Sequence, residues 1–240
     1  MVLSKYNMKK PNFQAEKTLW RKGYKKVACL DEAGRGPLAG PVTAGAVAML
    51  NTSYHIPYTG IRDSKKLSQK QREKFYNLIT KDKNMEWGIG IVSEKVIDKI
   101  NILEATKLAM IKAVNNLNAK LKKREKPCIK KSCDRRIFRH TDFLLLDGKM
   151  KINLPLPQKS IVKADEKVFS CALASILAKV TRDRIMVKFH LKYPRYHFNV
   201  HKGYPTKLHR KLLRKYGPCK IHRKSFRPVR ACPPKFSKKT

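Results

Sequence analysis

Short apolar runs bounded by charged or glycine-rich segments recur along the chain and predict five β-strands. Residues 27–31 (VACLD) form the first and 42–50 the second, which is rich in β-branched and small residues. Residues 85–93, 143–148 and 160–165 give three more. The run at 143–148 is almost wholly apolar, as in a strand covered on both faces of a sheet.

Helical periodicity separates these runs. Ser68 can cap a helix whose apolar residues share one face, and residues 93–100 suggest a short helix before a longer one at 102–121. A long helix is predicted over 166–193, and a short amphipathic helix follows Pro205. Strands interleaved with helices, without internal repeats, predict an α/β fold: a mixed sheet flanked by helices.

The charge pattern divides the chain into segments. A basic leader spans residues 1–25, one folded domain spans 26–229, and a basic tail spans 230–240, which we expect to be flexible. Residues 120–142 hold ten Lys or Arg with little apolar periodicity, so we expect a basic insertion there. No acidic residue occurs from Arg184 to Thr240.

Composition narrows the possible partners. The chain has 240 residues, with 56 Lys and Arg against 17 acids and a net charge of +39. Such a charge favours polyanionic partners such as nucleic acids, but many proteins are basic without having such a partner. No apolar run is long enough to span a membrane, and the first residues lack the apolar core of a secretory signal. We therefore expect a cytoplasmic protein with reduced cysteines.

Four acids stand in apolar surroundings, where a carboxylate is costly. Asp31 and Glu32 end the first predicted strand, Asp147 ends the fourth, and Asp165 ends the fifth just before a helix. Any one of these could simply end a strand or begin a turn. Acids at three strand ends in so basic a chain instead indicate a shared site for Mg²⁺ or Mn²⁺. Two such ions would make a phosphoryl-transfer site.

The segment GRGPLA (34–39) formally matches a dinucleotide-binding fingerprint, but its context does not. Two acids precede the glycines, and prolines and a strand-like run follow where a helix should begin. The glycines let a backbone approach closely, and Arg35 adds a phosphate-binding fork. A nucleic-acid strand beside the metal ions fits this segment better.

Several blocks in the same order resemble the ribonuclease HII family, with the resemblance running from about Val27 to Val229. They are DEAGRGPLAGPV, RDSKKLS, NILEAT, LLLDG, KADEKVFSCALASILAKVTRD, HKGYPTKLHR and HRKSFRPV. The resemblance implies the ribonuclease H-like fold: a mixed five-stranded sheet flanked by helices, with a helical C-terminal extension. It also implies cleavage on the 5′ side of ribonucleotides, leaving 3′-hydroxyl and 5′-phosphate ends.

The resemblance also implies roles for particular residues. Asp31, Glu32, Asp147 and Asp165 match the four metal-binding catalytic carboxylates, with Glu166 as the neighbouring alternative to Asp165. Asp183 lies too far along the long helix to join them, and we interpret it as structural.

Further matches concern the substrate. Gly34, Arg35 and Gly36 resemble the loop whose backbone contacts the ribose 2′-hydroxyl, the group that distinguishes RNA from DNA. Tyr204 resembles the tyrosine that stacks on the sugar of the following deoxynucleotide. Phosphate contacts are expected from a last set of residues: Lys65, Lys66 and Asn101.

The leading hypothesis is therefore an endoribonuclease with two Mn²⁺ or Mg²⁺ ions, acting on RNA/DNA hybrids and on ribonucleotide-containing duplex DNA, and expected to be a monomer. Two alternatives remain. A non-catalytic basic nucleic-acid-binding protein would explain the charge but not the placement of the acids. Another nuclease or an integrase could share the fold, since fold does not fix function.

Overall fold

The computed structural model describes residues 11–49, 60–61, 64–124 and 140–232. Residues 1–10 of the predicted leader, 125–139 of the predicted insertion and 233–240 of the predicted tail lie outside the described residues. Within the described part of the chain, no helix is long and apolar enough to cross a membrane.

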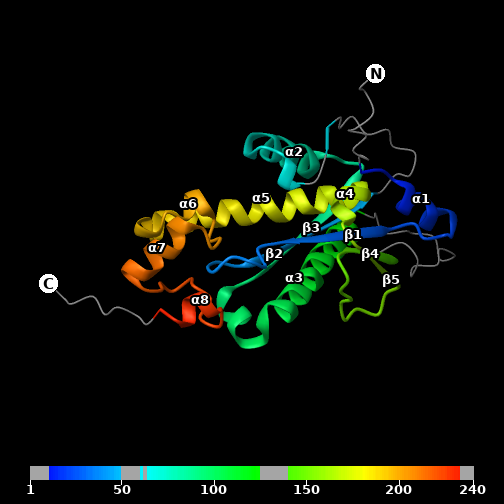
Figure 1. Cartoon of the computed structure of the whole chain (residues 1–240). Helices are drawn as coiled ribbons and strands as arrows, with labels where there is room; N and C mark the ends of the chain where they lie inside the picture. Colours follow the sequence, from blue (N-terminus) through cyan, green and yellow to red (C-terminus); the bar gives the residue numbers. More distant parts are fainter. Residues whose placement is uncertain (1–10, 50–59, 62–63, 125–139, 233–240) are drawn as a thin grey trace, which may run out of the picture.

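A mixed five-stranded sheet forms the centre of the molecule (Figure 1). Its strands run in the order β3-β2-β1-β4-β5. β2 pairs antiparallel with β1 and β3, whereas β4 pairs parallel with β1 and β5. The strands are β1 (Val27–Ala33), β2 (Val42–Met49), β3 (Met85–Val92), β4 (Phe143–Asp147) and β5 (Gln158–Ile161).

Two long helices cover the two faces of this sheet (Figure 1). α3 packs on β2 and β3 from one side, and α5 packs on β1 and β2 from the other. The helices before the C-terminal extension are α1 (Gln14–Arg21), α2 (Gln69–Lys81), α3 (Glu94–Arg124), α4 (Ala164–Lys167) and α5 (Phe169–Lys192), with a 3-10 turn η1 (Ser64–Lys66). This arrangement confirms the predicted fold class.

Glycines in β3 allow α3 to lie unusually close to the sheet. A Cβ built on Gly90 would stand 1.8 Å from the carbonyl oxygen of Ala109, and one on Gly88 would stand 2.1 Å from that of Ala113. Real side chains cannot occupy such space, so helix and strand backbones meet directly. The apolar core between them includes Leu30, Leu144 and Leu146.

The predicted leader contains a helix that the sequence analysis did not identify. α1 packs beside β1, and the backbone of Asn12 pairs with that of Val168. Glu16 of α1 is buried, and its Oε1 accepts a hydrogen bond from the backbone N–H of Ser170 at 3.1 Å. This carboxylate satisfies one of the free N–H groups at the start of α5, where the side chain of the N-cap residue Val168 makes no capping hydrogen bond.

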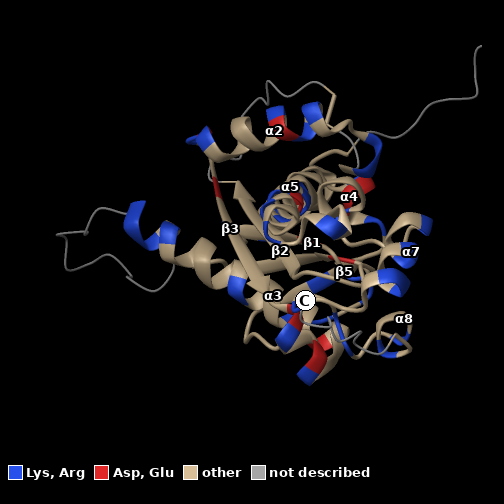
Figure 2. Cartoon of the chain, turned by 90° about the vertical axis from the view of Figure 1, so that its left-hand side faces the viewer, with Lys and Arg blue, Asp and Glu red and all other residues tan. Residues whose placement is uncertain are grey.

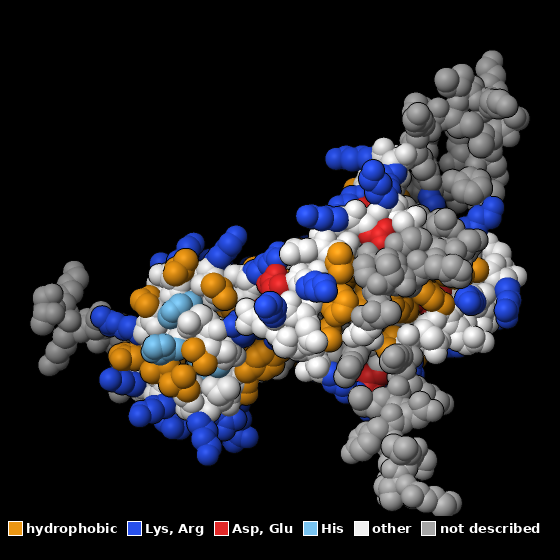
Figure 3. Space-filling view, turned by 90° about the horizontal axis from the view of Figure 1, so that it is seen from above, with side chains coloured by type: hydrophobic (Ala, Val, Ile, Leu, Met, Phe, Trp, Pro, Cys, Tyr) orange, Lys and Arg blue, Asp and Glu red, His pale blue; other side chains and the backbone are white. Residues whose placement is uncertain are grey.

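A helical extension follows α5 and folds back against the loop between β1 and β2. Its elements are η2 (Pro194–Tyr196), α6 (Phe198–His201), α7 (Lys207–Tyr216) and α8 (Arg227–Arg230). Backbone hydrogen bonds attach it to that loop, because Leu38 donates to Gly203 and Gly40 donates to Ile221, each at 2.8 Å. Lys and Arg occur along α7 and α8 (Figure 2) and surround apolar and histidine side chains at this end of the molecule (Figure 3).

Two predicted strand boundaries are wrong. β1 continues through Ala33, because β2 pairs with it as far as Ala33 and Thr43. β5 ends at Ile161, four residues before the predicted end, because Lys163 takes a left-handed conformation (φ 57°). The break predicted between the helices at 93–100 and 102–121 is confirmed, because α3 consists of two helical parts separated at Asn101, whose φ is 64°.

Candidate active site

Two aspartates lie side by side where β1 and β4 separate. Their parallel pairing ends at Leu30 and Leu146, and the next residues along the two strands are Asp31 and Asp147. β1 continues beyond this point paired only with β2, so the side of Asp31 that faces β4 is open. The sequence placed both acids at strand ends; the structure places Asp31 within β1 and Asp147 at the end of β4.

Asp165 reaches the same place from a short helix rather than from a strand. The turn at Lys163 ends β5, and Asp165 lies in the first turn of α4. The backbone N–H of Ala164 donates to Oδ1 of Asp147 at 2.6 Å, which fixes α4 against the end of β4. The predicted strand-end position of Asp165 is therefore wrong.

The three carboxylates form one cluster. Oxygen atoms of Asp31, Asp147 and Asp165 all lie within 4.8 Å of one another. Asp31 is 5% exposed and Asp165 is 3% exposed, so water screens their charges poorly. Asp147 and Asp165, which follow Asp31 by 116 and 134 positions in the sequence, thus converge with it at one edge of the sheet.

Glu32 lies beside this cluster but is not part of it. Successive side chains on a strand point to opposite faces, so Glu32 and Asp31 leave β1 in opposite directions. Its Oε1 accepts a hydrogen bond from Nη1 of Arg35 at 3.1 Å. Its Oε2 is buried without a partner among the described residues. Burial raises the pKa of Glu32, while the hydrogen bond and charge of Arg35 oppose that shift.

Burial raises the pKa of Asp31 well above its usual value, and the charges of Glu32 and Asp147 raise it further. A hydrogen bond from Ser175 of α5 partly opposes the shift. Ser175 in turn shares a hydrogen bond of 2.7 Å with the hydroxyl of Ser64. The folded chain without a cation therefore holds a proton on Asp31 more tightly than the unfolded chain does.

The cluster fits divalent cations. Hard ions such as Mg²⁺ and Mn²⁺ bind carboxylate oxygens, and their charge offsets the repulsion that raises the pKa of Asp31. Asp31, Asp147 and Asp165 would hold such ions, and the unpartnered Oε2 of Glu32 is a further oxygen ligand nearby.

Two lysines flank the cluster from the turn before α2. Nζ of Lys65 lies 3.4 Å from Oδ2 of Asp165, and Nζ of Lys66 lies 3.7 Å from Oε1 of Glu166. The side chain of Lys65 is 78% exposed, so its ammonium stands at the mouth of the site. Their predicted contact with phosphates stays a prediction, and their position beside the carboxylates is compatible with it.

The loop after β1 carries Gly34, Arg35 and Gly36 next to the carboxylates. Gly34 has φ +98°, and a Cβ there would stand 2.1 Å from Nε of Arg182. Only glycine fits that position without displacing the guanidinium. A Cβ on Gly36 would meet no atom within 4 Å, so this residue faces open space.

Tyr204 lies close to this loop, although 168 residues separate it from Gly36. Its ring lies 5.3 Å from Nζ of Lys179 and 5.6 Å from the guanidinium carbon of Arg182. The same guanidinium packs against Gly34, so Arg182 lies between the two predicted substrate-reading elements.

The side chain of Asn101 caps a helix. Its Oδ1 accepts hydrogen bonds from the backbone N–H groups of Leu103 and Glu104, at 2.8 and 3.1 Å. This pattern caps the second part of α3 after the break. The predicted phosphate contact of Asn101 stays a prediction.

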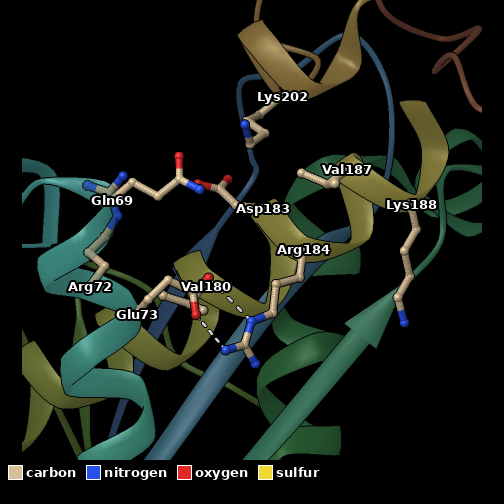
Figure 4. Close-up of a pocket in the computed structure, with 9 residues that line it drawn as sticks. All are labelled: Gln69, Arg72, Glu73, Val180, Asp183, Arg184, Val187, Lys188 and Lys202. Carbon is tan, nitrogen blue, oxygen red and sulfur yellow. Dashed lines mark hydrogen bonds and ion pairs between the residues drawn. The ribbon is translucent and has the colours of Figure 1, made fainter. Parts of the chain in front are cut away.

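Asp183 lies outside the carboxylate cluster, as predicted, and pairs with Nζ of Lys179 at 2.9 Å. It lines a pocket of about 390 Å³ between α2 and α5 (Figure 4). Arg184 binds Glu73 across this pocket, and Lys202 points into it from the extension (Figure 4). Cations outnumber acids around the pocket.

Comparison with known proteins identifies the family. The sequence model described as ribonuclease HII matches residues 28–229. A ribonuclease HII of Chlamydia caviae is 44% identical over 217 residues, covering 90% of each chain. That of Caldicellulosiruptor bescii is 45% identical over 214 residues, covering 89% of this chain and 92% of its own. The chain belongs to the ribonuclease HII family.

Solved structures with the same fold agree with this assignment. The ribonuclease H2 of Pyrococcus horikoshii OT3 has a TM-score of 0.59 and 25% identity, covering 86% of this chain and 96% of its own. Bst-RNase HIII in complex with Mn²⁺ has a TM-score of 0.54 and 14% identity, covering 85% of this chain and 68% of its own. The second likeness concerns the fold alone. Ribonuclease HII enzymes are nucleases that cleave RNA in RNA/DNA hybrids.

Three residues that contact the site or its loop, Ser175, Arg182 and Arg223, were not predicted from the sequence. Ser175 could have been noticed in the sequence, because it is a polar residue on an otherwise apolar face of the helix. Arg182 and Arg223 are both 0% exposed, and both donate hydrogen bonds to backbone carbonyls. One of these carbonyls, that of Lys202, is 20 positions from Arg182, and all the others are 140 or more positions away in the sequence. Carbonyl partners leave no trace in side-chain identity, so no sequence pattern could have revealed them.

We expect Asp31→Asn to stabilise the metal-free protein. Above the pKa of the folded state, Asp31 is an ionised group in a buried, repulsive site, and the neutral amide removes that cost. We expect the free energy of unfolding to rise by about 1 kcal/mol. For a chain of this size that corresponds to a rise of roughly 2–4 °C in the melting temperature, measured in EDTA at neutral pH. The gain should shrink as the pH falls, because a protonated Asp31 resembles Asn.

Asp183→Asn is the matched control, because it removes a carboxylate of α5 that pairs with Lys179. Its melting temperature should not rise. Mn²⁺ should stabilise the wild type and the Asp183→Asn control more than Asp31→Asn. An Asp31→Asn protein that is no more stable than the wild type in EDTA would contradict this description of the site.

Proposed function

We propose that this chain is an endoribonuclease that cuts on the 5′ side of ribonucleotides embedded in duplex DNA and degrades the RNA of RNA/DNA hybrids. Two-metal-ion catalysis would leave 3′-hydroxyl and 5′-phosphate ends. The observation that carries the proposal is the convergence of Asp31, Asp147 and Asp165 within 4.8 Å, in a chain of the ribonuclease HII family.

Asp31, Asp147 and Asp165 would hold the ions. Bound divalent ions supply positive charge that activates a water molecule and stabilises the leaving oxygen of a phosphodiester. Asp147 is held in place by the N–H of Ala164, and Asp31 by Ser175 and the N–H of Glu32 at 2.7 Å. These hydrogen bonds orient the oxygens before any ligand arrives, which lowers the reorganisation needed during the reaction.

The residues around the carboxylates would select the substrate. The backbone of the Gly34–Gly36 segment would contact the ribose 2′-hydroxyl. The ring of Tyr204 would stack on the next sugar, where it leaves room for the 2′-hydrogen of a deoxyribose but not for the 2′-hydroxyl of a ribose. Lys65, Lys66 and Arg35 would bind phosphates around the cut. Basic side chains on α7 and α8 (Figure 2) would hold the flanking duplex. The expected setting is the cytoplasm.

The first test is a gel assay, with Mg²⁺ or Mn²⁺, that compares two end-labelled substrates. One is duplex DNA with a single ribonucleotide, and the other is an all-DNA duplex that serves as the control. We expect one metal-dependent cut 5′ of the ribonucleotide and none in the control. Asp147→Asn should abolish this cut and leave binding largely intact, because it removes a metal ligand and no substrate contact. Asp183→Asn is again the matched control.

Binding without cutting under either ion would favour a non-catalytic binding protein. Near-normal turnover by Asp147→Asn would contradict the assignment of the carboxylates.

Gly36→Ala tests the close approach of substrate to the loop. The new methyl group meets no atom within 4 Å, so the melting temperature should stay unchanged. The same methyl group would stand where the ribose approaches, so kcat/KM on the single-ribonucleotide duplex should fall about tenfold, which is roughly 1.4 kcal/mol. An unchanged kcat/KM would show that substrate does not contact the loop at Gly36.

A further inference from the structure

Two buried arginines lie beneath the Gly34–Pro41 loop with no carboxylate partner. Arg182 and Arg223 are both 0% exposed, and within the described part of the chain neither forms a salt bridge. Burial lowers the pKa of Arg223 to about 9 and the charge of Arg182 adds to that shift, so Arg223 still carries its charge at neutral pH. Backbone carbonyls satisfy both guanidinium groups instead.

Arg223 fixes both ends of this loop with one guanidinium. Nη2 donates to the carbonyl oxygen of Gly34 at 2.6 Å and Nη1 to that of Arg35 at 3.0 Å. Nε donates to Gly40 at 2.9 Å and Nη2 also to Pro41 at 3.1 Å. The planar fork of arginine matches this set of acceptors, whereas the single nitrogen of lysine cannot reach them all.

These hydrogen bonds determine which way the peptide groups of the loop face. In a trans peptide the C=O and the following N–H point in opposite directions. The carbonyls of Gly34 and Arg35 face Arg223, so the N–H groups of Arg35 and Gly36 face away from it. No described residue accepts a hydrogen bond from these two N–H groups, and Gly36 borders open space. They are free to donate to a ligand.

The preceding residue, His222, connects to the other substrate-reading element. Nδ1 of His209 lies 2.9 Å from the carbonyl oxygen of Tyr204, which can only accept, so this nitrogen carries the proton. Nε2 of His209 is then the acceptor for the Nε2–H of His222 at 3.1 Å. Nδ1 of His222 accepts from the backbone N–H of Cys219 at 2.9 Å. Burial keeps both rings neutral by lowering the pKa of each, that of His222 to about 3.

The backbone holds His222 and Arg223 directly against the loop. Ala39 and His222 form an isolated β-bridge, and the N–H of Arg223 donates to the carbonyl of Leu38 at 2.8 Å. One dipeptide of the C-terminal extension therefore contacts the Gly34–Gly36 segment through one side chain and reaches Tyr204 through the other.

We propose that His222 and Arg223 are positioning residues that set the ribonucleotide specificity of the site. Arg223 turns the N–H groups of Arg35 and Gly36 toward the ribose 2′-hydroxyl, and His222, through His209, sets the place of Tyr204 relative to them. The inference rests on the proposed function, because it assigns those two elements to substrate reading.

The test for Arg223 measures how much the 2′-hydroxyl contributes to binding. In an Asp147→Asn background, which prevents cleavage, affinities are measured for a duplex with one ribonucleotide and for the matched all-DNA duplex. Arg223→Lys keeps the charge but loses the fork. We expect it to reduce the ratio of the two affinities about tenfold while the affinity for all-DNA duplex stays near that of the parent.

The test for His222 measures discrimination at the next sugar. We expect His222→Asn to lower the ratio of kcat/KM for the single-ribonucleotide duplex over that for an RNA/DNA hybrid, about tenfold. Both substrates are cut by the same preparation, so the folded fraction cancels in the ratio. If Arg223→Lys is insoluble, this variant alone decides the proposal.

Leu121→Ala is the control for lost stability. Leu121 is buried in α3, near the end of the sheet where Met49 pairs with Met85 and far from Val42 and the loop. It should lower the melting temperature and leave both ratios unchanged. Variants at Arg223 and His222 that fold and keep the wild-type ratios would overturn the inference alone. A wild-type chain that cuts neither substrate would overturn the proposed function, and this inference with it.

Discussion

The parallel pairing of β1 with β4 ends at Leu30 and Leu146, and the next residue on each strand is an aspartate. Neighbouring strands lie about 4.8 Å apart, so the sheet itself forces two carboxylates together. α4 adds Asp165, and burial leaves little water to screen the charges. The rest of the fold holds this unfavourable arrangement in place, with α3 and α5 covering the two faces of the sheet. Divalent cations held by these carboxylates would offset the same repulsion.

α5 connects the carboxylates with the loop between β1 and β2, which we propose reads the substrate. Ser175 hydrogen-bonds Asp31 near one end of the helix, and two turns later Arg182 binds the carbonyls of Ala39 and Pro41. Small buried residues, Ala174 and Ala178 among them, let the helix lie against the sheet. The carboxylates and the segments that we propose to read the substrate therefore contact the same helix, so a shift of α5 would move both.

The sequence predicted the elements better than the contacts between them. Apolar periodicity located all five strands, and Ser68 does cap α2, where it forms a capping box with Gln71. Three of the four predicted carboxylates converge, because acids that follow apolar runs mark the edge of a sheet. Asp165 was placed on a strand because nothing in the residue types announces the left-handed turn at Lys163. Arg223 was missed because its partners are backbone carbonyls up to 189 positions away.

We expect a divalent cation that binds the carboxylate cluster to displace a proton from it. Calorimetric titration of the protein with Mn²⁺, in buffers of different ionisation enthalpy, measures the protons released on binding. The account predicts proton release over a pH range above the one in which an ordinary carboxyl group ionises, and this release declines as the pH rises through the raised pKa of Asp31. It also predicts that Asp31→Asn removes most of this release. Binding with no proton release anywhere in that range would contradict the account.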